Sequence, residues 1–409
     1  MKIRPIFLIC FAVTSLYASD PTALLHDPQV KAAFAAIEHN EPEMISEQIR
    51  VCEIAAPPFM EQQRGLELKR LFDGLKLHDV HIDKAGNVIG SRPGAAPHPN
   101  VVIAAHLDTV FPEGTAVKVT RNGNILRGPG IGDDCRGLAV LLGMIHALNE
   151  TQIKTIGTIT FVADVGEEGL GDLRGMKELF GDMKGQIDDF ISVDGLGTGI
   201  TNIGVGSYRY KVIFNGLGGH SYGAFGMANP IQAMGRAIAK IDAFEVPTEP
   251  KTTFNVGRVG GGTSVNAIPF EAWMEVDMRS ADVKSLEALH AKFKAAMNDA
   301  VTEENARWNG RGPVKVSLEL VGLRPAGNTP ESSAIVQTAE AVSKSLSLPV
   351  HLGEGSTDSN VPMNLGIPAI TIGGGGKGSG AHSLNETYDT TDSWKGTERA
   401  LLLALSLAQ

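Results

Sequence analysis

The sequence predicts an α/β protein built on a mostly parallel sheet with helices on both faces, interrupted by a smaller inserted α+β domain. Three observations carry this prediction. Short, continuous apolar segments lie between helical segments in the first half of the chain. Between residues 207 and 322 longer strands and two helices follow the order β-α-β-β-α-β. The earlier pattern then returns from residue 323 to the end.

Residues 20–206 are expected to form the first part of the larger domain. The apolar runs VVIAA (101–105), ITFVA (159–163) and FISV (190–193) are continuous, as strands buried on both faces require. Helical patterns lie between such runs, and one of them follows Asp133 and Asp134. This alternation is typical of an α/β fold with a mostly parallel sheet.

Residues 207–322 are expected to form the inserted domain. Strands are predicted at 207–216, 253–259, 271–279 and 314–321. The first helix begins after Asn229, a good N-cap, with Pro230 at its first position, and the second begins at Asp282. The resulting order of elements is that of a ferredoxin-like sandwich.

The second part of the larger domain is expected over residues 323–409. It contains a predicted helix at 334–345 and a strand, IPAITI, at 367–372. A chain of 409 residues is long enough for two domains at about 150 residues per domain. The smaller domain is therefore interpreted as an insertion into the larger one.

The first nineteen residues have the layout of a secretory signal peptide. Lys2 and Arg4 precede an apolar run over 5–16, and cleavage is expected near Ala18 or Ser19. The run is too short to span a membrane. We therefore expect a secreted or periplasmic protein with no integral membrane segment after signal removal; a buried N-terminal helix is the alternative.

Composition excludes several classes of protein. Apolar residues make up 43% of the chain and charged residues 20%, which is ordinary for a globular protein and excludes disorder. The formal net charge is −10 and no basic run is present in the sequence, so nucleic acid is not an expected partner. The 48 glycines cluster around charged residues and histidines, which indicates functional loops.

Acidic residues and histidines gather near the ends of the predicted strands and at the start of a helix. In chain order these residues are His106, Asp108, Asp133, Glu167, Glu168, Asp194 and His382. Sites in open α/β sheets form beyond the carboxyl ends of the strands, so these side chains are expected in one crevice. Two histidines with several carboxylates suit zinc, manganese or cobalt.

With these residues in view, the chain resembles the co-catalytic two-zinc hydrolase family of aminoacylase, peptidase T and glutamate carboxypeptidase. The resemblance covers nearly the whole chain after the signal segment. It implies a zinc-exopeptidase-like catalytic domain with an inserted lid, through which dimeric members pair. The matching strings, in order, are HLDTV, GPGIGDD, GEEG, SVDG, GLGGHS, TSVNAIP, VDMRS, GSTDSN and GAHSLNE.

The resemblance also implies a ligand set for two Zn²⁺ ions per subunit, with Mn²⁺ or Co²⁺ as alternatives. Asp133 corresponds to the carboxylate that bridges the two ions. His106 and Asp194 correspond to further ligands of one ion, and Glu168 and His382 to those of the other.

Five other residues take roles from the same resemblance. Glu167 corresponds to the general acid/base, and Asp108 to a carboxylate that orients the site. On the lid, His220 and Asn266 correspond to groups that stabilise the oxyanion, and Arg279 to the group that holds the substrate carboxylate. In dimeric relatives the histidine enters the active site of the partner subunit, so a homodimer through the lid is expected.

The chemistry of such a site needs these residue types. Two metal ions polarise a scissile carbonyl and lower the pKa of a bridging water toward ~7, and a free carboxylate moves the proton to the leaving amine. We therefore predict an exported exopeptidase that acts on short peptides. An N-acyl-amino-acid deacylase that uses the same site is the alternative, and a non-catalytic binding protein on this fold is a distant one.

Cys135 departs from the family, which very often has lysine after the acidic pair. A buried, inert thiol is the favoured interpretation. A further metal ligand and a disulfide with Cys52, formed after export, are the alternatives. Two cysteines in the mature chain are too few for a disulfide scaffold, so the core is expected to be hydrophobic.

Overall fold

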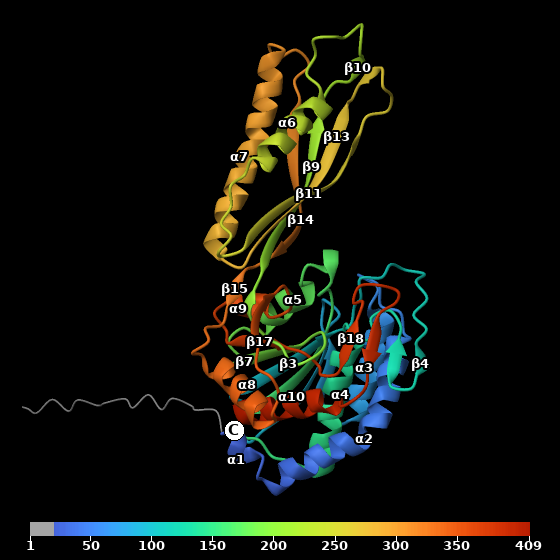
Figure 1. Cartoon of the computed structure of the whole chain (residues 1–409), viewed down its shortest axis with the longest axis vertical. Coiled ribbons are helices and arrows are strands. Elements are labelled where there is room, and N and C mark those ends of the chain that lie inside the picture. Colours follow the sequence, from blue (N-terminus) through green and yellow to red (C-terminus); the bar gives the residue numbers. More distant parts are fainter. Residues whose placement is uncertain (1–19) are drawn as a thin grey trace, which may run out of the picture.

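The computed structural model describes residues 20–409, so the predicted signal segment lies outside the described residues. The molecule has two lobes, placed end to end along its long axis (Figure 1). The larger lobe contains a nine-stranded sheet with helices, and the smaller lobe contains a four-stranded sheet. The larger lobe is formed by two separate stretches of the chain, one on each side of the smaller lobe.

One sheet forms the centre of the larger lobe. In chain order its strands are β1 (His78–Ile82), β2 (Val88–Arg92), β3 (Asn100–His106), β6 (Thr158–Asp164), β7 (Asp189–Val193), β8 (Ile200–Gly204), β15 (Gly327–Asn328), β16 (Leu352–Gly355) and β17 (Ala369–Ile372). The neighbouring strands β6, β3, β7 and β17 run parallel, while β2 and β8 flank them in the antiparallel direction. The predicted α/β fold with a mostly parallel central sheet is confirmed.

Helices cover both faces of this sheet. They are α1 (Pro21–Leu24), α2 (Pro28–Cys52), α3 (Gln62–Gly74), α4 (Cys135–Thr151), α5 (Arg174–Asp182), α8 (Ala334–Ser345), α9 (Asn360–Asn364) and α10 (Trp394–Leu407), with a 3₁₀ turn at Gly169–Gly171. Successive side chains of β3 point to opposite faces. Val101, Ile103 and Ala105 join the core formed with α2, α4 and α10, whereas Val102 and Ala104 pack with α5 and α9.

The smaller lobe, called the lid below, has the predicted order of elements. Its elements are β9 (Gly206–Asn215), β10 (Gly219–His220), α6 (Pro230–Asp242), β11 (Thr252–Gly261), β12 (Ala267–Ile268), β13 (Glu271–Ser280), α7 (Val283–Arg307) and β14 (Lys315–Arg324). The antiparallel sheet runs β11-β13-β9-β14, and β10 pairs separately with β12 as a short ribbon. Asn229 caps α6 through its side chain, as the sequence indicates. Both long helices pack on one face of the sheet around a separate core.

A second small sheet joins distant parts of the larger lobe. It runs β18-β19-β5-β4 and consists of β4 (Thr120–Asn122), β5 (Ile125–Arg127), β18 (Lys377–Ser379) and β19 (Thr387–Asp389). Its pairing of β19 with β5 places the loop that contains His382 beside the loop that leads to Asp133. This sheet has no recognisable signal in the sequence, because each of its strands has only three residues.

Cys135 is buried, but it is not a free thiol. It forms a disulfide with Cys52 at the end of α2, so the favoured interpretation of an inert thiol is wrong and the disulfide alternative is confirmed.

Within residues 20–409, none of the helices combines the length and the apolar character needed to cross a membrane.

Candidate metal centre

The five predicted ligands converge at the carboxyl edge of the central strands. His106 ends β3, Glu168 and Asp194 follow β6 and β7, Asp133 precedes α4, and His382 follows β18. Within the described residues these side chains form two groups of three, in each of which the ligand atoms lie within 4.8 Å of one another. The groups are His106–Asp133–Asp194 and Asp133–Glu168–His382, and they share Asp133.

Asp133 lies between two histidines. Its Oδ1 is 3.1 Å from His106 Nε2, and its Oδ2 is 3.1 Å from His382 Nε2. Asp194 Oδ1 lies 3.9 Å from His106 Nε2, and Glu168 Oε1 lies 2.9 Å from His382 Nε2. The residues therefore offer mixed nitrogen and oxygen donors on each side of one carboxylate, a set that fits two divalent ions such as zinc.

The electrostatics of this cluster also fit cations. Burial, followed by the charge of Glu167, raises the pKa of Glu168 to about 7. Burial and the charge of Asp133 raise the pKa of Asp194 well above its usual range. A hydrogen bond with Asp133 is the main cause that raises the pKa of His382 to about 9. Crowded buried carboxylates that resist ionisation without a counter-charge are typical of a functional site.

Asp108 holds the loop after β6, and it does so through its carboxylate. Oδ1 accepts hydrogen bonds from the backbone N–H groups of Gly166 and Glu167, and Oδ2 accepts one from Glu168. The side chain of His106 instead contacts the backbone carbonyl of Asp108, at 2.9 Å from Nδ1. A proton on Nδ1 satisfies this contact and leaves the Nε2 lone pair directed at the ligand cluster.

Glu167 is buried and has a cationic partner that the sequence analysis missed. Arg324 Nη1 donates to Glu167 Oε1 at 3.0 Å, and the same guanidinium donates to the backbone carbonyl of Glu167. Burial raises the pKa of Glu167, and Arg324 opposes this effect. Arg324 ends β14 and belongs to none of the quoted strings, so no signal in the sequence connected it with Glu167.

Two further carboxylates support the loop of Asp133. Glu386 accepts hydrogen bonds from the backbone N–H groups of Gly130, Gly132 and Asp133. Asp134 caps α4 and also accepts from the backbone N–H of His106. Both residues lie inside quoted strings, GAHSLNE and GPGIGDD, although the sequence analysis assigned neither of them a role.

The three predicted lid residues do not join the cluster within one chain. His220 is exposed on β10, at the end of the lid remote from the larger lobe (Figure 1). Asn266 immediately precedes β12, and its backbone carbonyl accepts from Ser221, so it lies beside His220. Arg279 on β13 donates to Asp277 at 2.7 Å and lines a hollow of about 510 Å³ together with Leu170, from the loop after Glu168.

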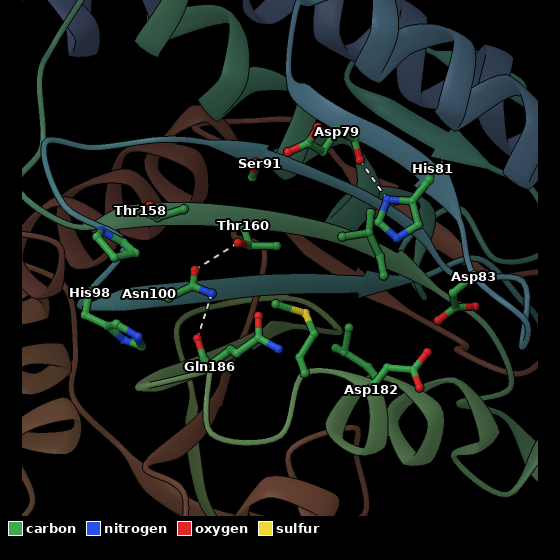
Figure 2. A pocket seen from close by; sticks show the side chains of 14 residues that line it. Asp79, His81, Asp83, Ser91, His98, Asn100, Thr158, Thr160, Asp182 and Gln186 are labelled. Atoms are coloured by element: carbon green, nitrogen blue, oxygen red, sulfur yellow. Dashed lines mark hydrogen bonds between the residues drawn. The ribbon is translucent and has the colours of Figure 1, made fainter.

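A second cavity lies at the opposite, amino edge of the central strands. Its volume is about 500 Å³, and His81, His98, Asp79 and Asp182 are among its lining residues (Figure 2). None of the ligand groups found over residues 20–409 includes these side chains. His98 is already paired with Asp188 at 2.6 Å. Over residues 20–409, histidines and carboxylates thus occur at both edges of the sheet, but only at the carboxyl edge do they lie close enough together to hold a metal ion.

The chain is similar to known proteins in sequence and in fold. Residues 102–406 match the model of "Peptidase family M20/M25/M40". Carboxypeptidase G2 of a Pseudomonas species is 26% identical over 346 residues, which are 82% of this chain and 79% of that protein. Succinyl-diaminopimelate desuccinylase of Corynebacterium glutamicum is 25% identical over 354 residues, 82% of this chain and 89% of that protein.

The fold is also similar to that of a solved aminopeptidase PepT from Bacillus cereus. The TM-score is 0.74 at 23% identity, and the match covers 90% of this chain and 99% of that one. The family model alone spans well over half of the sequence. The chain therefore belongs to peptidase family M20/M25/M40, and it is a metallo-hydrolase.

Proposed function

We propose that this protein is an exported two-zinc exopeptidase that hydrolyses the amide bond of short peptides. The observation that carries the proposal is the position of Asp133, which lies between two histidines and belongs to two ligand groups. His106 and Asp194 would complete one ion site, and Glu168 and His382 the other. Ions bound there would supply a polarised scissile carbonyl and a water of lowered pKa.

Glu167 is the proposed general acid/base. It belongs to neither of the two groups that share Asp133, yet it forms a further group with His106 and Glu168, so one of its carboxylate oxygens lies within 4.8 Å of ligand atoms of both. It would accept the proton of the attacking water and then pass it to the leaving nitrogen. Arg324 orients this carboxylate through Oε1, and Asp108 fixes the loop on which it lies.

The lid residues are proposed to act across a homodimer. His220 Nδ1 accepts hydrogen bonds from the backbone N–H groups of Tyr222 and Gly223, so a neutral ring carries its proton on Nε2 and can donate it to an oxyanion. Large apolar side chains around the β10–β12 ribbon are exposed: Tyr222 has 89% of its surface accessible, and Val265 is fully exposed. Such a patch is typical of an interface. Arg279 would hold the substrate carboxylate.

Deacylation of an N-acyl amino acid is the second candidate, because the same centre cleaves any amide placed across it. The two relatives reported above support one candidate each by name, a carboxypeptidase and a desuccinylase. The test is a turnover assay of the zinc-loaded protein on matched pairs of dipeptides and N-acyl amino acids. We expect faster hydrolysis of dipeptides, about two ions per chain, and reversible loss of activity on chelation. Full activity without metal contradicts the proposal.

Export is proposed on two grounds. The N-terminal segment has a positive start and an apolar run, and the Cys52–Cys135 disulfide is of a kind that persists in oxidising compartments. N-terminal sequencing of protein secreted by an expressing cell checks this proposal, with a mature end near residue 19 as the expected result.

A further inference from the structure

The disulfide lies beside the candidate metal centre. Cys52 is the last residue of α2, and Cys135 is the first residue of α4, two positions after Asp133. Both side chains are fully buried, and their Cα atoms are 5.5 Å apart. The bond therefore joins the end of α2 to the start of α4, directly after the loop that presents Asp133.

The loop over residues 128–134 is held by two separate parts of the chain. Glu386 accepts hydrogen bonds from three backbone N–H groups of the loop, including that of Asp133. Gln48 of α2 donates to the carbonyl of Ile131 at 2.7 Å, and the disulfide adds a covalent link from the same helix to Cys135, directly after the loop. These contacts restrain the position of the loop that carries Asp133.

Arg64 also connects the end of α2 with the strand end that carries His106. The buried guanidinium of Arg64 donates to the carbonyl of Cys52 at 3.1 Å and to that of Leu107 at 2.7 Å. Leu107 follows His106 directly. Through Arg64 and the disulfide, Cys52 is thus connected both to the end of β3 at His106 and to the loop of Asp133, and these two residues belong to the same ligand group.

We propose that the Cys52–Cys135 disulfide is a positioning device for the metal centre, so that the closed disulfide and divalent-metal binding favour each other. This inference rests on the proposed metal-binding function. Groups that orient ligands change metal affinity by about 10- to 100-fold when they are lost. Coupling between two binding or bonding equilibria is reciprocal, so bound metal must favour the disulfide by the same factor.

The first test removes the bond. The double variant Cys52→Ala/Cys135→Ala is compared with the wild type by calorimetric titration of metal-free protein with Co²⁺. We expect the Kd of at least one site to rise by about 10- to 100-fold. Leu148→Ala is the matched control: it leaves a cavity in the buried face of α4, at the end remote from Cys135, and should lower Tm without changing the Kd.

The second test uses the wild-type chain and does not depend on whether the variant folds. The native disulfide is equilibrated with glutathione, where two glutathione thiols supply two electrons and two protons and become one glutathione disulfide, while Cys52 and Cys135 become thiols. The equilibrium constant is measured by thiol counting with and without Mn²⁺, which thiolates bind weakly. We expect Mn²⁺ to disfavour reduction by the same 10- to 100-fold.

The outcomes separate the two proposals. Unchanged Co²⁺ affinity in a folded double variant, or a glutathione equilibrium that Mn²⁺ does not shift, overturns the inference and leaves the proposed function intact. A wild-type chain that binds no divalent ion overturns both.

Discussion

The five predicted ligands in the larger lobe and the three predicted substrate residues on the lid differ in how the fold places them. The ligands lie within a few ångströms of one another in one chain, on loops fixed by Asp108, Asp134 and Glu386. His220 and Asn266 lie on an exposed ribbon at the far end of the lid. The larger lobe alone therefore brings the predicted ligands together, whereas the proposed substrate roles of His220 and Asn266 would require a second chain to bring them to the cluster.

The largest expected effect concerns Glu167 inside the larger lobe. Glu167→Gln cannot take a proton, so kcat should fall by about 10²- to 10⁴-fold while the metal content is unchanged. Glu168→Gln, one residue away, should instead lose metal, because Glu168 belongs to a ligand group with Asp133 and His382. Elemental analysis with kinetics checks both variants. Equal metal loss in the two would mean that the roles of the pair are assigned wrongly.

A variant of His220 tests the proposed role of the lid. His220→Ala should lower kcat by about 10²- to 10³-fold with both ions retained, since it removes a donor to the oxyanion. If each subunit of a homodimer supplies His220 to the site of the other, each heterodimer of His220→Ala and Glu167→Gln protein contains one site with both groups intact. Mixing the two variants should therefore restore activity at that site. Verified heterodimers that remain inactive, or a chain that is monomeric in solution, would refute the action across subunits.

Arg279 is expected to affect binding of the substrate. Arg279→Met should raise KM for substrates with a free carboxylate by about 10- to 100-fold, because a hydrogen bond to a charged group contributes about 1.5–3 kcal/mol. Arg258→Met is the matched control, since Arg258 lines the same hollow and pairs with Glu275. A similar KM change in the two variants would indicate a general effect of charge.

The smallest expected effect is the pH dependence of stability in the metal-free chain. The pKa of Glu168 is raised from 4.5 to about 7, and that of His382 from 6.5 to about 9, so the folded chain holds protons that the unfolded chain releases. The free energy of unfolding should therefore fall as pH rises from 5 to 8. Calorimetry with a chelator should give a Tm a few degrees lower at pH 8, and added Zn²⁺ should reverse the trend. A higher metal-free Tm at pH 8 would contradict this account.

The parts of the fold that the sequence predicts well are those with strong local patterns. The helix expected at 334–345 is α8 (Ala334–Ser345), and β3 covers the run at 101–105 with every residue buried. Apolar periodicity and capping residues are local, so they can be read without knowing the partner segments.

The contacts that the sequence did not predict join residues far apart in the chain. Arg324 and Glu167 are 157 positions apart, and Glu386 and Asp133 are 253 apart. The pairing of Cys52 with Cys135 spans 83 residues and stood as an alternative. Residue type and spacing cannot assign such partners, because they depend on how β5 and β19, and α2 and α4, meet in space.

An anomalous-scattering map of crystals grown with Zn²⁺, measured at the zinc absorption edge, shows directly whether Asp133 is a ligand of both ions. We predict two zinc peaks on opposite sides of Asp133, one contacted by His106 and Asp194 and the other by Glu168 and His382, at about 2.0–2.2 Å from the ligand atoms. A single peak, or peaks that do not contact Asp133, would contradict the role of Asp133 as a shared ligand.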